Sequence, residues 1–372
     1  MSFRRFAWAS FHHKSGLPPS HHHRLVRVFS LLIPHMEQLP PSSSFSDLPE
    51  DIARIVFQLV ADRATTDALA CALVCKMAKL WVEPSIYREV VVDAGGLFLR
   101  TVKAPTSTKP PDFFAVHVKS LFFESVENDV AIAEVLQKCR SVTSLAFWDI
   151  GSGYKTSLSQ NLSTIALTPT RLSLLTDLVP PTGRHFRHPI FQAVTHLDLC
   201  VEPNKSPGWT WTTLKEMASL THLSLFLSNV GGPRQFAQVP VKYLPPSFRV
   251  LVICVHRSAD DDEIKAMSEG RVDPRAMVAF LGTSAAEEPP CRHTFFMTWT
   301  EFQNEWKHPS KVYPDAWTRA EKLIEQRQLE QSGKCKTILL NVFMCRRTSP
   351  FIPQSLRPST PLESSCPIKG NP

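Results

Sequence analysis

The chain has 372 residues, of which 43% are hydrophobic and 20% are charged. This proportion of apolar side chains is enough for a buried core and excludes a chain that is disordered throughout. The formal charge of +7 is modest, and no run of five or more Lys or Arg occurs, so a nucleic-acid-binding role has little support.

The first 36 residues contain five Lys or Arg and no acidic residue, a composition that loosely resembles a mitochondrial transit peptide. Pro18, Pro19 and the histidines at 21–23 would interrupt an amphipathic helix, so we expect a disordered leader over residues 1–44. No run of about eighteen apolar residues occurs in the chain, so we expect no membrane-spanning helix.

Residues 45–92 have the pattern of a small helical module. Asp47 can cap a helix, and Pro49 followed by two acids is typical of a first helical turn. A second helix is predicted up to about Val82, where Glu83 and Pro84 would end it. Two short helices cannot bury all their apolar side chains alone, so a partner or the following domain must cover them. These side chains recur at helical spacing: Ile52, Ile55, Val56 and Leu59, then Leu69, Leu73, Leu80 and Trp81.

A weak repeat follows a linker over residues 93–112 and extends over residues 113–300. Each unit has a leucine followed two places later by an apolar residue, an alternation typical of a β-strand. The asparagine that regular leucine-rich repeats place after the strand is missing, so the pattern predicts a solenoid of degenerate repeats. The key leucines, spaced 24, 27, 25, 26 and 28 residues apart, are Leu121, Leu145, Leu172, Leu197, Leu223 and Leu251.

In such a solenoid, the residues that flank each key leucine would face an open surface. Aromatic side chains exposed there would be typical of a protein-binding surface, unless loops or the C-terminal segment cover them. The candidate residues of this protein-binding surface are Phe122, Trp148, Arg171, His196, His222 and Phe226.

Two of these candidates, His196 and His222, would lie at equivalent positions on adjacent strands, about 5 Å apart. With Asp198 or Cys200 nearby, the two histidines could suggest a zinc site, but the sequence does not firmly place a third ligand. We therefore expect a plain cross-strand pair, with no metal and no cofactor. The nine cysteines form no CxxC pair, which argues against a zinc ribbon or a disulfide framework. No GxSxG, HExxH, P-loop or dinucleotide motif is present, so we do not expect an enzyme.

The C-terminal part changes in pattern after residue 259. The acidic run 260–263 is typical of a helix start, an interpretation preferred here to a metal site. A short helix is predicted over residues 274–280, and a longer one over residues 314–330. We expect a helical cap over residues 301–347 and a disordered, Pro- and Ser-rich tail over residues 348–372.

The helical module resembles an F-box, of the divergent F-box-like type found in large families of fungal (basidiomycete-type) proteins. The match covers about a tenth of the chain, and the order and spacing of its short motifs carry it. The chain has Ala78 where the family usually places a Trp, and Trp81 follows one helical turn later. The matching residues are Leu48, Pro49, Ile52, the stretch 67–74, Val74, Cys75, Lys76, Pro84 and Tyr87.

The resemblance implies a substrate-recognition adaptor of a Skp-cullin-F-box type ubiquitin ligase, in the cytoplasm or nucleus. In that family, the helices bind a Skp-type linker subunit, which connects the adaptor to a cullin, and the repeat domain binds a protein substrate. The resemblance implies these linker contacts: Leu48, Pro49, Ile52, Ile55, Leu73, Cys75 and Trp81.

The sequence thus predicts an α+β or α/β chain with a small helical F-box-like module followed by an irregular leucine-rich-repeat-like solenoid. We expect no nucleic acid and no membrane among its partners. The alternative is a non-catalytic repeat scaffold, in which the N-terminal helices only cap the end of the solenoid, as terminal repeats require.

Overall fold

The computed structural model describes residues 48–93, 96–104, 109–124, 129–148, 160, 162, 164–178, 185–201, 210–227, 233–256, 261–282 and 291–332. The expected leader (1–44) and tail (348–372) lie outside the described residues. The chain divides into two compact units between Ile324 and Glu325. Of the second unit, the structure describes only the end of one helix and Ser332.

Over residues 48–93, the first unit contains three helices, α2 (Glu50–Ala61), α3 (Thr65–Ala72) and α4 (Lys76–Ile86). The sequence predicted two, because the break at 73–75 contains neither Gly nor Pro. Cys75 begins α4 as its cap, since its Sγ accepts a hydrogen bond from the Ala78 amide at 3.3 Å. The helix also continues through Pro84, which the sequence had placed at its end. The three helices share a small core: Phe57, Val60, Ala61, Ala68, Cys71, Ala78 and Val82.

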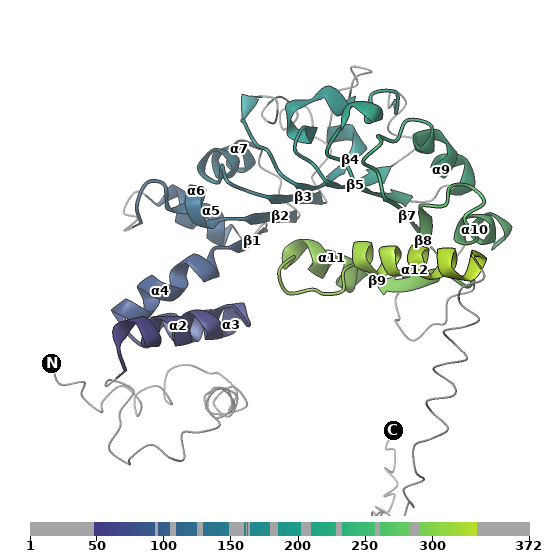
Figure 1. Ribbon diagram of the computed structural model, residues 1–372. Helices are drawn as coiled ribbons and strands as arrows, with labels where there is room; N and C mark the ends of the chain where they lie inside the picture. The colour runs from purple at the N-terminus through teal and green to yellow at the C-terminus, as the bar shows by residue number, and fades with distance from the viewer. Residues whose placement is uncertain are drawn as a thin grey trace, which may run out of the picture. The chain divides into compact units, whose positions relative to one another are not determined.

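The rest of the unit is organised around one sheet whose nine strands are all parallel and follow one another in chain order (Figure 1). The six predicted strand segments are strands β2 to β7, and their key leucines pair in register from each strand to the next. The strands are β1 (Glu89–Val92), β2 (Ser120–Glu124), β3 (Ser144–Trp148), β4 (Arg171–Leu175), β5 (His196–Val201), β6 (His222–Leu227), β7 (Val250–His256), β8 (Ala276–Gly282) and β9 (Thr294–Thr298).

Helices lie against both faces of this sheet, which overturns the predicted fold class. One face packs on α5 (Leu97–Lys103), α6 (Phe113–His117), α7 (Asp129–Lys138), α9 (Pro233–Val241) and α10 (Asp261–Ser268). The other packs on α11 (Trp299–Lys307) and on α12 (Ala316–Gln331), of which the residues up to Ile324 belong to this unit. The chain is therefore an α/β protein with a nine-stranded parallel sheet, and the predicted solenoid is wrong.

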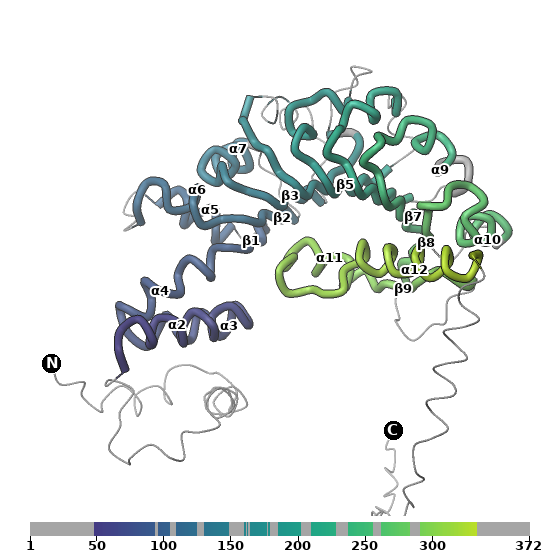
Figure 2. Tube along the Cα trace, viewed as in Figure 1, coloured from purple at the N-terminus to yellow at the C-terminus, as the bar shows by residue number. Residues whose placement is uncertain are grey.

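The key leucines all lie on the face that packs against α5 to α10, where each is fully buried. Figure 2 shows that the helices between strands return along this same side of the sheet. The residues next to each leucine point to the opposite face, as the two-residue period of a strand requires. Among them, Phe122, Ala146 and Val252 pack with Phe302 and Trp317 in a second core under α11 and α12.

Strand β8 replaces the short helix that was predicted over residues 274–280. Its sequence, AMVAFLG, is a continuous apolar run, and every residue except the last is buried. A parallel strand that is covered on both faces has this composition, and periodicity alone does not separate it from a buried helix. The helices predicted from the acidic run 260–263 and over residues 314–330 are present as α10 and α12.

A row of threonine hydroxyls links successive strands at their amino ends. Thr143 Oγ1 donates to the Lys119 carbonyl at 3.1 Å, and Thr170 Oγ1 donates to the Thr143 carbonyl at 3.1 Å. Thr195 and Thr221 continue the row, with distances of 3.0 Å each. Each threonine stands two places before a key leucine, so its hydroxyl fixes the register of one strand on its neighbour.

Candidate functional site

The helices α2, α3 and α4 expose an unusual number of large apolar side chains. Single exposed hydrophobic residues are normal on a protein surface, but a concentration within about thirty residues marks an interaction surface. We call these nine residues, which are 38–70% exposed, the apolar surface of the module: Leu48, Ile52, Ile55, Leu59, Leu69, Leu73, Val74, Met77 and Leu80.

Helix α2 is apolar on two sides, which explains how this surface arises. Phe57 and Val60 are 5% and 1% exposed and belong to the small core of the module. Ile52, Ile55 and Leu59 follow one another at spacings of three and four residues and are 46–54% exposed, so they form a separate stripe along the helix. The sequence pattern had identified this stripe, and the structure leaves it uncovered.

Five of the seven residues that the F-box resemblance assigned to linker binding are exposed: Leu48, Pro49, Ile52, Ile55 and Leu73. The other two, Cys75 and Trp81, serve the module itself. Cys75 caps α4, and the ring of Trp81 packs against Phe57 with 6.0 Å between ring centroids.

The remaining members of the apolar surface were not selected from the sequence as contact residues. They are Leu59, Leu69, Val74, Met77 and Leu80. The helical spacing of Leu59, Leu69 and Leu80 was visible in the sequence, but periodicity alone does not show whether an apolar stripe is covered. Ala78, which stands where the F-box family usually has a Trp, is fully buried between the helices. A larger side chain at this position would have to push the helices apart.

The six residues predicted to bind substrate lie on one face of the sheet, which confirms their common orientation. They do not form an open surface, because α11 and the first part of α12 cover the face. Phe122, His222 and Phe226 are 0%, 5% and 9% exposed, and Trp148, Arg171 and His196 are partly buried. The alternative weighed from the sequence, that the C-terminal segment covers these residues, describes the structure.

Arg171 illustrates how this covered face is held. Its guanidinium lies over the Trp306 ring, 5.2 Å from the centroid, and 3.9 Å from the Asp315 carboxylate. Burial lowers the pKa of Arg171, while Asp315 and Glu305 oppose that shift. A buried cation between carboxylates and an aromatic ring joins the sheet to α11 and to the start of α12.

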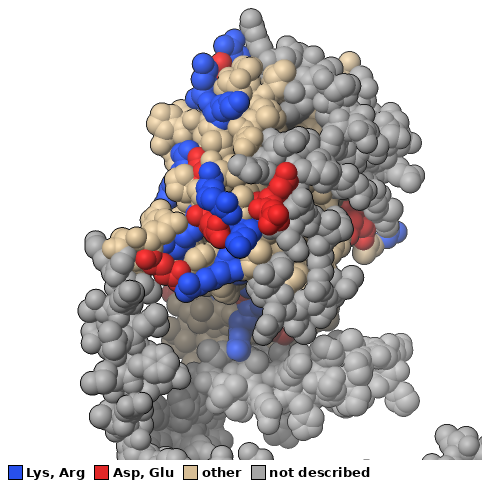
Figure 3. Space-filling model, turned by 90° about the vertical axis from the view of Figure 1, so that its right-hand side faces the viewer, with Lys and Arg blue, Asp and Glu red and all other residues tan. Residues whose placement is uncertain are grey.

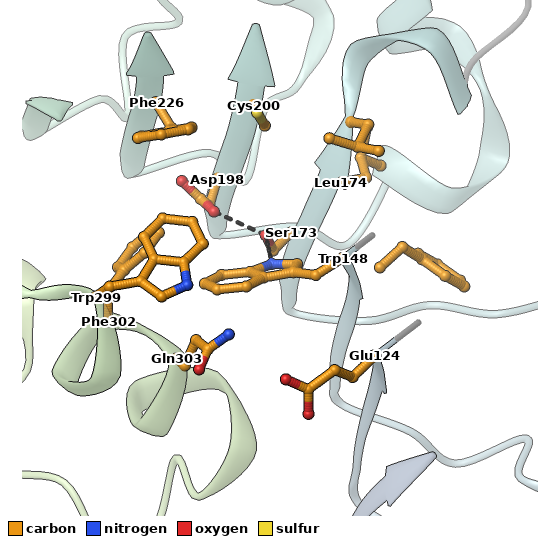
Figure 4. Close-up of a pocket in the computed structure, with 12 residues that line it drawn as sticks. Glu124, Trp148, Ser173, Leu174, Asp198, Cys200, Phe226, Trp299, Phe302 and Gln303 are labelled. Carbon is orange, nitrogen blue, oxygen red and sulfur yellow. Dashed lines mark hydrogen bonds between the residues drawn. The ribbon is translucent and has the colours of Figure 1, made fainter. Parts of the chain in front are cut away.

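A cavity of about 310 Å³ lies between the sheet and α11. Figure 4 shows Trp148, Trp299 and Phe302 on one side of it and Asp198 on the other. Asp198 Oδ2 accepts a hydrogen bond from the Ser173 hydroxyl at 2.7 Å, and Ser173 Oγ accepts one from Trp148 Nε1 at 2.8 Å. Burial raises the pKa of Asp198 to about 6, although the Ser173 hydrogen bond lowers it.

Among the residues that the structure describes, no group of three or more His, Cys, Asp or Glu could hold a metal ion. None of the described helices is long and apolar enough to cross a membrane. On the face shown in Figure 3, the described Lys and Arg side chains are interspersed with Asp and Glu. Arg271 and Glu269, for example, form an ion pair at 2.8 Å.

No family model matches the chain, and no curated protein matches its sequence. The functional assignment therefore depends on the module's own residues and geometry.

Proposed function

We propose that this chain is a non-catalytic adaptor of a Skp-cullin-F-box type ubiquitin ligase. The helical module binds a Skp-type linker subunit and through it a cullin, and the sheet domain binds a protein substrate. The observation that carries the proposal is the apolar surface of the module, together with the F-box-like order of motifs in the same residues.

The energetics of the module favour a partner. Full burial of a Leu, Ile, Val or Met side chain stabilises a complex by about 1.5–3 kcal/mol before the costs of association. Nine such side chains are 38–70% exposed, while the small core beneath them is already complete. A partner that covers this surface therefore gains free energy from burial of these side chains and does not have to rearrange the core of the module.

The rival function, a module that only caps the sheet, predicts a different distribution of apolar residues. A cap would bury its apolar face against the neighbouring domain. Here the module has its own core, separate from the core beneath the sheet, and the nine residues of its apolar surface are exposed instead of packing in either core. This arrangement supports docking to a further protein.

Charges around the apolar surface suggest how the partner is oriented. Glu50 and Asp51 are exposed at the start of α2, next to Ile52, whereas Lys76 and Lys79 are exposed along α4. A linker subunit with a basic group near the start of α2 and acidic groups along α4 would complement this pattern.

A binding experiment with the Skp-type subunit of the same organism tests the proposal. The full chain should capture the subunit, and Leu48→Ala with Pro49→Ala should weaken capture at least tenfold. Leu73→Asp should abolish it, because the introduced carboxylate would be buried in the interface without a partner. Leu97, on α5, is a matched control, since it is 67% exposed and Leu73 is 70% exposed.

Leu97→Asp should leave capture unchanged. If the wild-type chain fails to bind the subunit, or if Leu73→Asp binds as tightly as Leu97→Asp, the adaptor proposal is wrong. Ligases of this type act in the cytoplasm and nucleus, and we propose the same location for this chain.

A further inference from the structure

The cavity beside α11 is formed where five parallel strands end. Glu124 and Trp148 are the last residues of β2 and β3, and Cys200 and Phe226 lie near the ends of β5 and β6. In parallel α/β sheets, ligands bind preferentially at this edge. Its volume of about 310 Å³ is at the lower end of the range of small-molecule sites, about 300–1,000 Å³.

Three aromatic rings form one wall of the cavity. The centroid of Trp148 lies 5.2 Å from that of Trp299 and 5.1 Å from that of Phe302. Among the described residues, no Lys or Arg side chain lies over any of these three rings. Other aromatic residues on the same face are already occupied in this way, since Lys307 lies over Phe122. The parts of these rings that line the cavity can therefore contact a bound cation.

The opposite side of the cavity carries a buried carboxylate. Asp198 is 2% exposed, and Oδ2 accepts the Ser173 hydrogen bond. Oδ1 accepts no hydrogen bond of good geometry from the described residues, although Ser224 on the next strand is near enough to lower the pKa. Burial and these two serines set the pKa of Asp198. Glu124, also at the cavity, is by contrast paired with Lys307 at 2.8 Å.

We propose that this cavity binds the ammonium group of an organic cation, primary or N-methylated. Asp198 is its counter-ion, and the rings of Trp148, Trp299 and Phe302 contact it through cation–π interactions. Hydrogen bonds from Trp148 to Ser173 and from Ser173 to Asp198 fix the position of the Trp148 ring relative to the carboxylate. A neutral apolar ligand would leave a buried carboxylate without a partner, which is unfavourable.

The ligand class also agrees with the protonation of Asp198. Burial raises its pKa to about 6, so the carboxyl group is mostly ionised at pH 7. A bound cation favours the ionised form of Asp198 and therefore lowers this raised pKa. We expect the affinity to fall as the pH decreases below about 6.

Titration of the purified full chain with choline tests the proposal, with calorimetry as the readout. The comparison ligand is 3,3-dimethyl-1-butanol, which has the same shape as choline without the positive charge. We expect choline to bind at least tenfold more tightly. Equal binding of the two compounds, or no saturable binding of choline, would overturn the proposal.

Variants locate the binding. Asp198→Asn should weaken choline binding at least tenfold and leave the neutral alcohol unaffected. Asp273→Asn is the matched control, since Asp273 is 7% exposed and pairs with Arg275 outside the cavity. Trp299, which is 43% exposed, offers a second variant that does not disturb the core, and Trp299→Leu should weaken choline binding severalfold. Unchanged choline affinity in a folded Asp198→Asn or Trp299→Leu variant contradicts the site.

Two sources can supply such a group, a free metabolite or a methylated lysine side chain. A peptide that carries trimethyl-lysine, titrated beside its unmethylated counterpart, distinguishes them. Tighter binding of the methylated peptide than of choline identifies a protein ligand, and binding of choline alone identifies a free one. Neither result depends on capture of the linker subunit, so failure of this site leaves the adaptor proposal standing.

Discussion

The imidazole rings of His196 and His222 stack face to face, with their centroids 4.2 Å apart and their planes 5° from parallel. The two residues are direct partners in the register of β5 and β6, as the sequence alignment of the strands predicted. His222 Nε2 lies 3.2 Å from Glu321 Oε1, and the Trp317 ring contacts both imidazoles edge-on. Two rings this close cannot both be positively charged imidazolium ions without strong repulsion.

The histidine pair predicts a loss of stability in acid. Burial lowers the pKa of His196 to about 3, with a further contribution from His222. Between pH 6.5 and about pH 3, His196 is protonated in the unfolded chain and neutral in the folded chain. The free energy of unfolding should therefore fall with decreasing pH in this window, by up to about 1.4 kcal/mol per pH unit for this group.

Buried carboxyl groups act in the opposite direction. Burial raises the pKa of Glu305 from 4.5 to about 7 and that of Asp198 from 3.8 to about 6. Their contribution to the free energy of unfolding therefore decreases as the pH rises, from about 4.5 to 7 for Glu305 and from about 3.8 to 6 for Asp198. Urea denaturation of wild type and His196→Gln at several pH values separates the two effects. The variant should lose less stability between pH 6.5 and 4 than the wild type. Identical pH dependence in the two proteins would contradict the assignment.

The module should respond differently to truncation of its core and of its apolar surface. Phe57→Ala should lower the free energy of unfolding by about 3–5 kcal/mol, because it removes a ring that is 5% exposed. Leu59→Ala, two residues away and 54% exposed, should change it by less than about 0.5 kcal/mol. Hydrogen exchange of the α2 amides measures both. A large loss from Leu59→Ala would mean that this stripe is covered within the chain itself.

Arg319 and Glu305 provide a test of the contact between α11 and α12. Glu305 Oε1 accepts hydrogen bonds from Arg319 and from the Ala316 amide, each at 2.9 Å, and the Glu305 side chain is 3% exposed. Arg319→Met should destabilise the protein by about 1–3 kcal/mol, because it removes a hydrogen-bond donor from the buried Glu305 carboxyl group. Glu305→Gln with Arg319→Met should recover part of this loss in thermal denaturation. If the double variant is less stable than Arg319→Met, the pair is not the source of the effect.

The threonine row predicts a small and specific effect. Thr170→Val keeps the shape of the side chain and removes the bond to the Thr143 carbonyl, so it should cost about 0.5–1.5 kcal/mol. Thr66, exposed on α3, is a control in which the same change should cost less. Equal losses at the two positions in urea denaturation would show that the bond to Thr143 contributes nothing.

The six strands with key leucines could be predicted because each strand repeats a local pattern. Leu197, for example, alternates with polar His196 and Asp198, and this alternation is visible without any structure. Strand β8 could not be predicted, since a strand that is buried on both faces has no alternation. The prediction of the fold class was wrong for a related reason. Whether α11 and α12 lie on the sheet depends on contacts such as Trp306 with Arg171, which are distant in sequence.

The candidate sites divide in the same way. Ile52 and Leu73 could be selected by resemblance, and the structure adds only that they are exposed. The residues of the cavity are brought together from β2 to β6 and α11, so no local pattern contains them. The threonine row did have a local signal, because Thr precedes the key leucine by two places in four of the six segments.

The cover formed by α11 and α12 has a consequence during translation. The strands that contain Phe122, Trp148 and Phe226 are synthesised more than seventy residues before Trp299, so their second apolar face has no intramolecular partner while the nascent chain grows. Parallel strands with an uncovered apolar face are prone to aggregation at this stage. We expect ribosome-bound chains that end before residue 299 to be strong chaperone substrates, and chains that extend beyond residue 324 to be released from them.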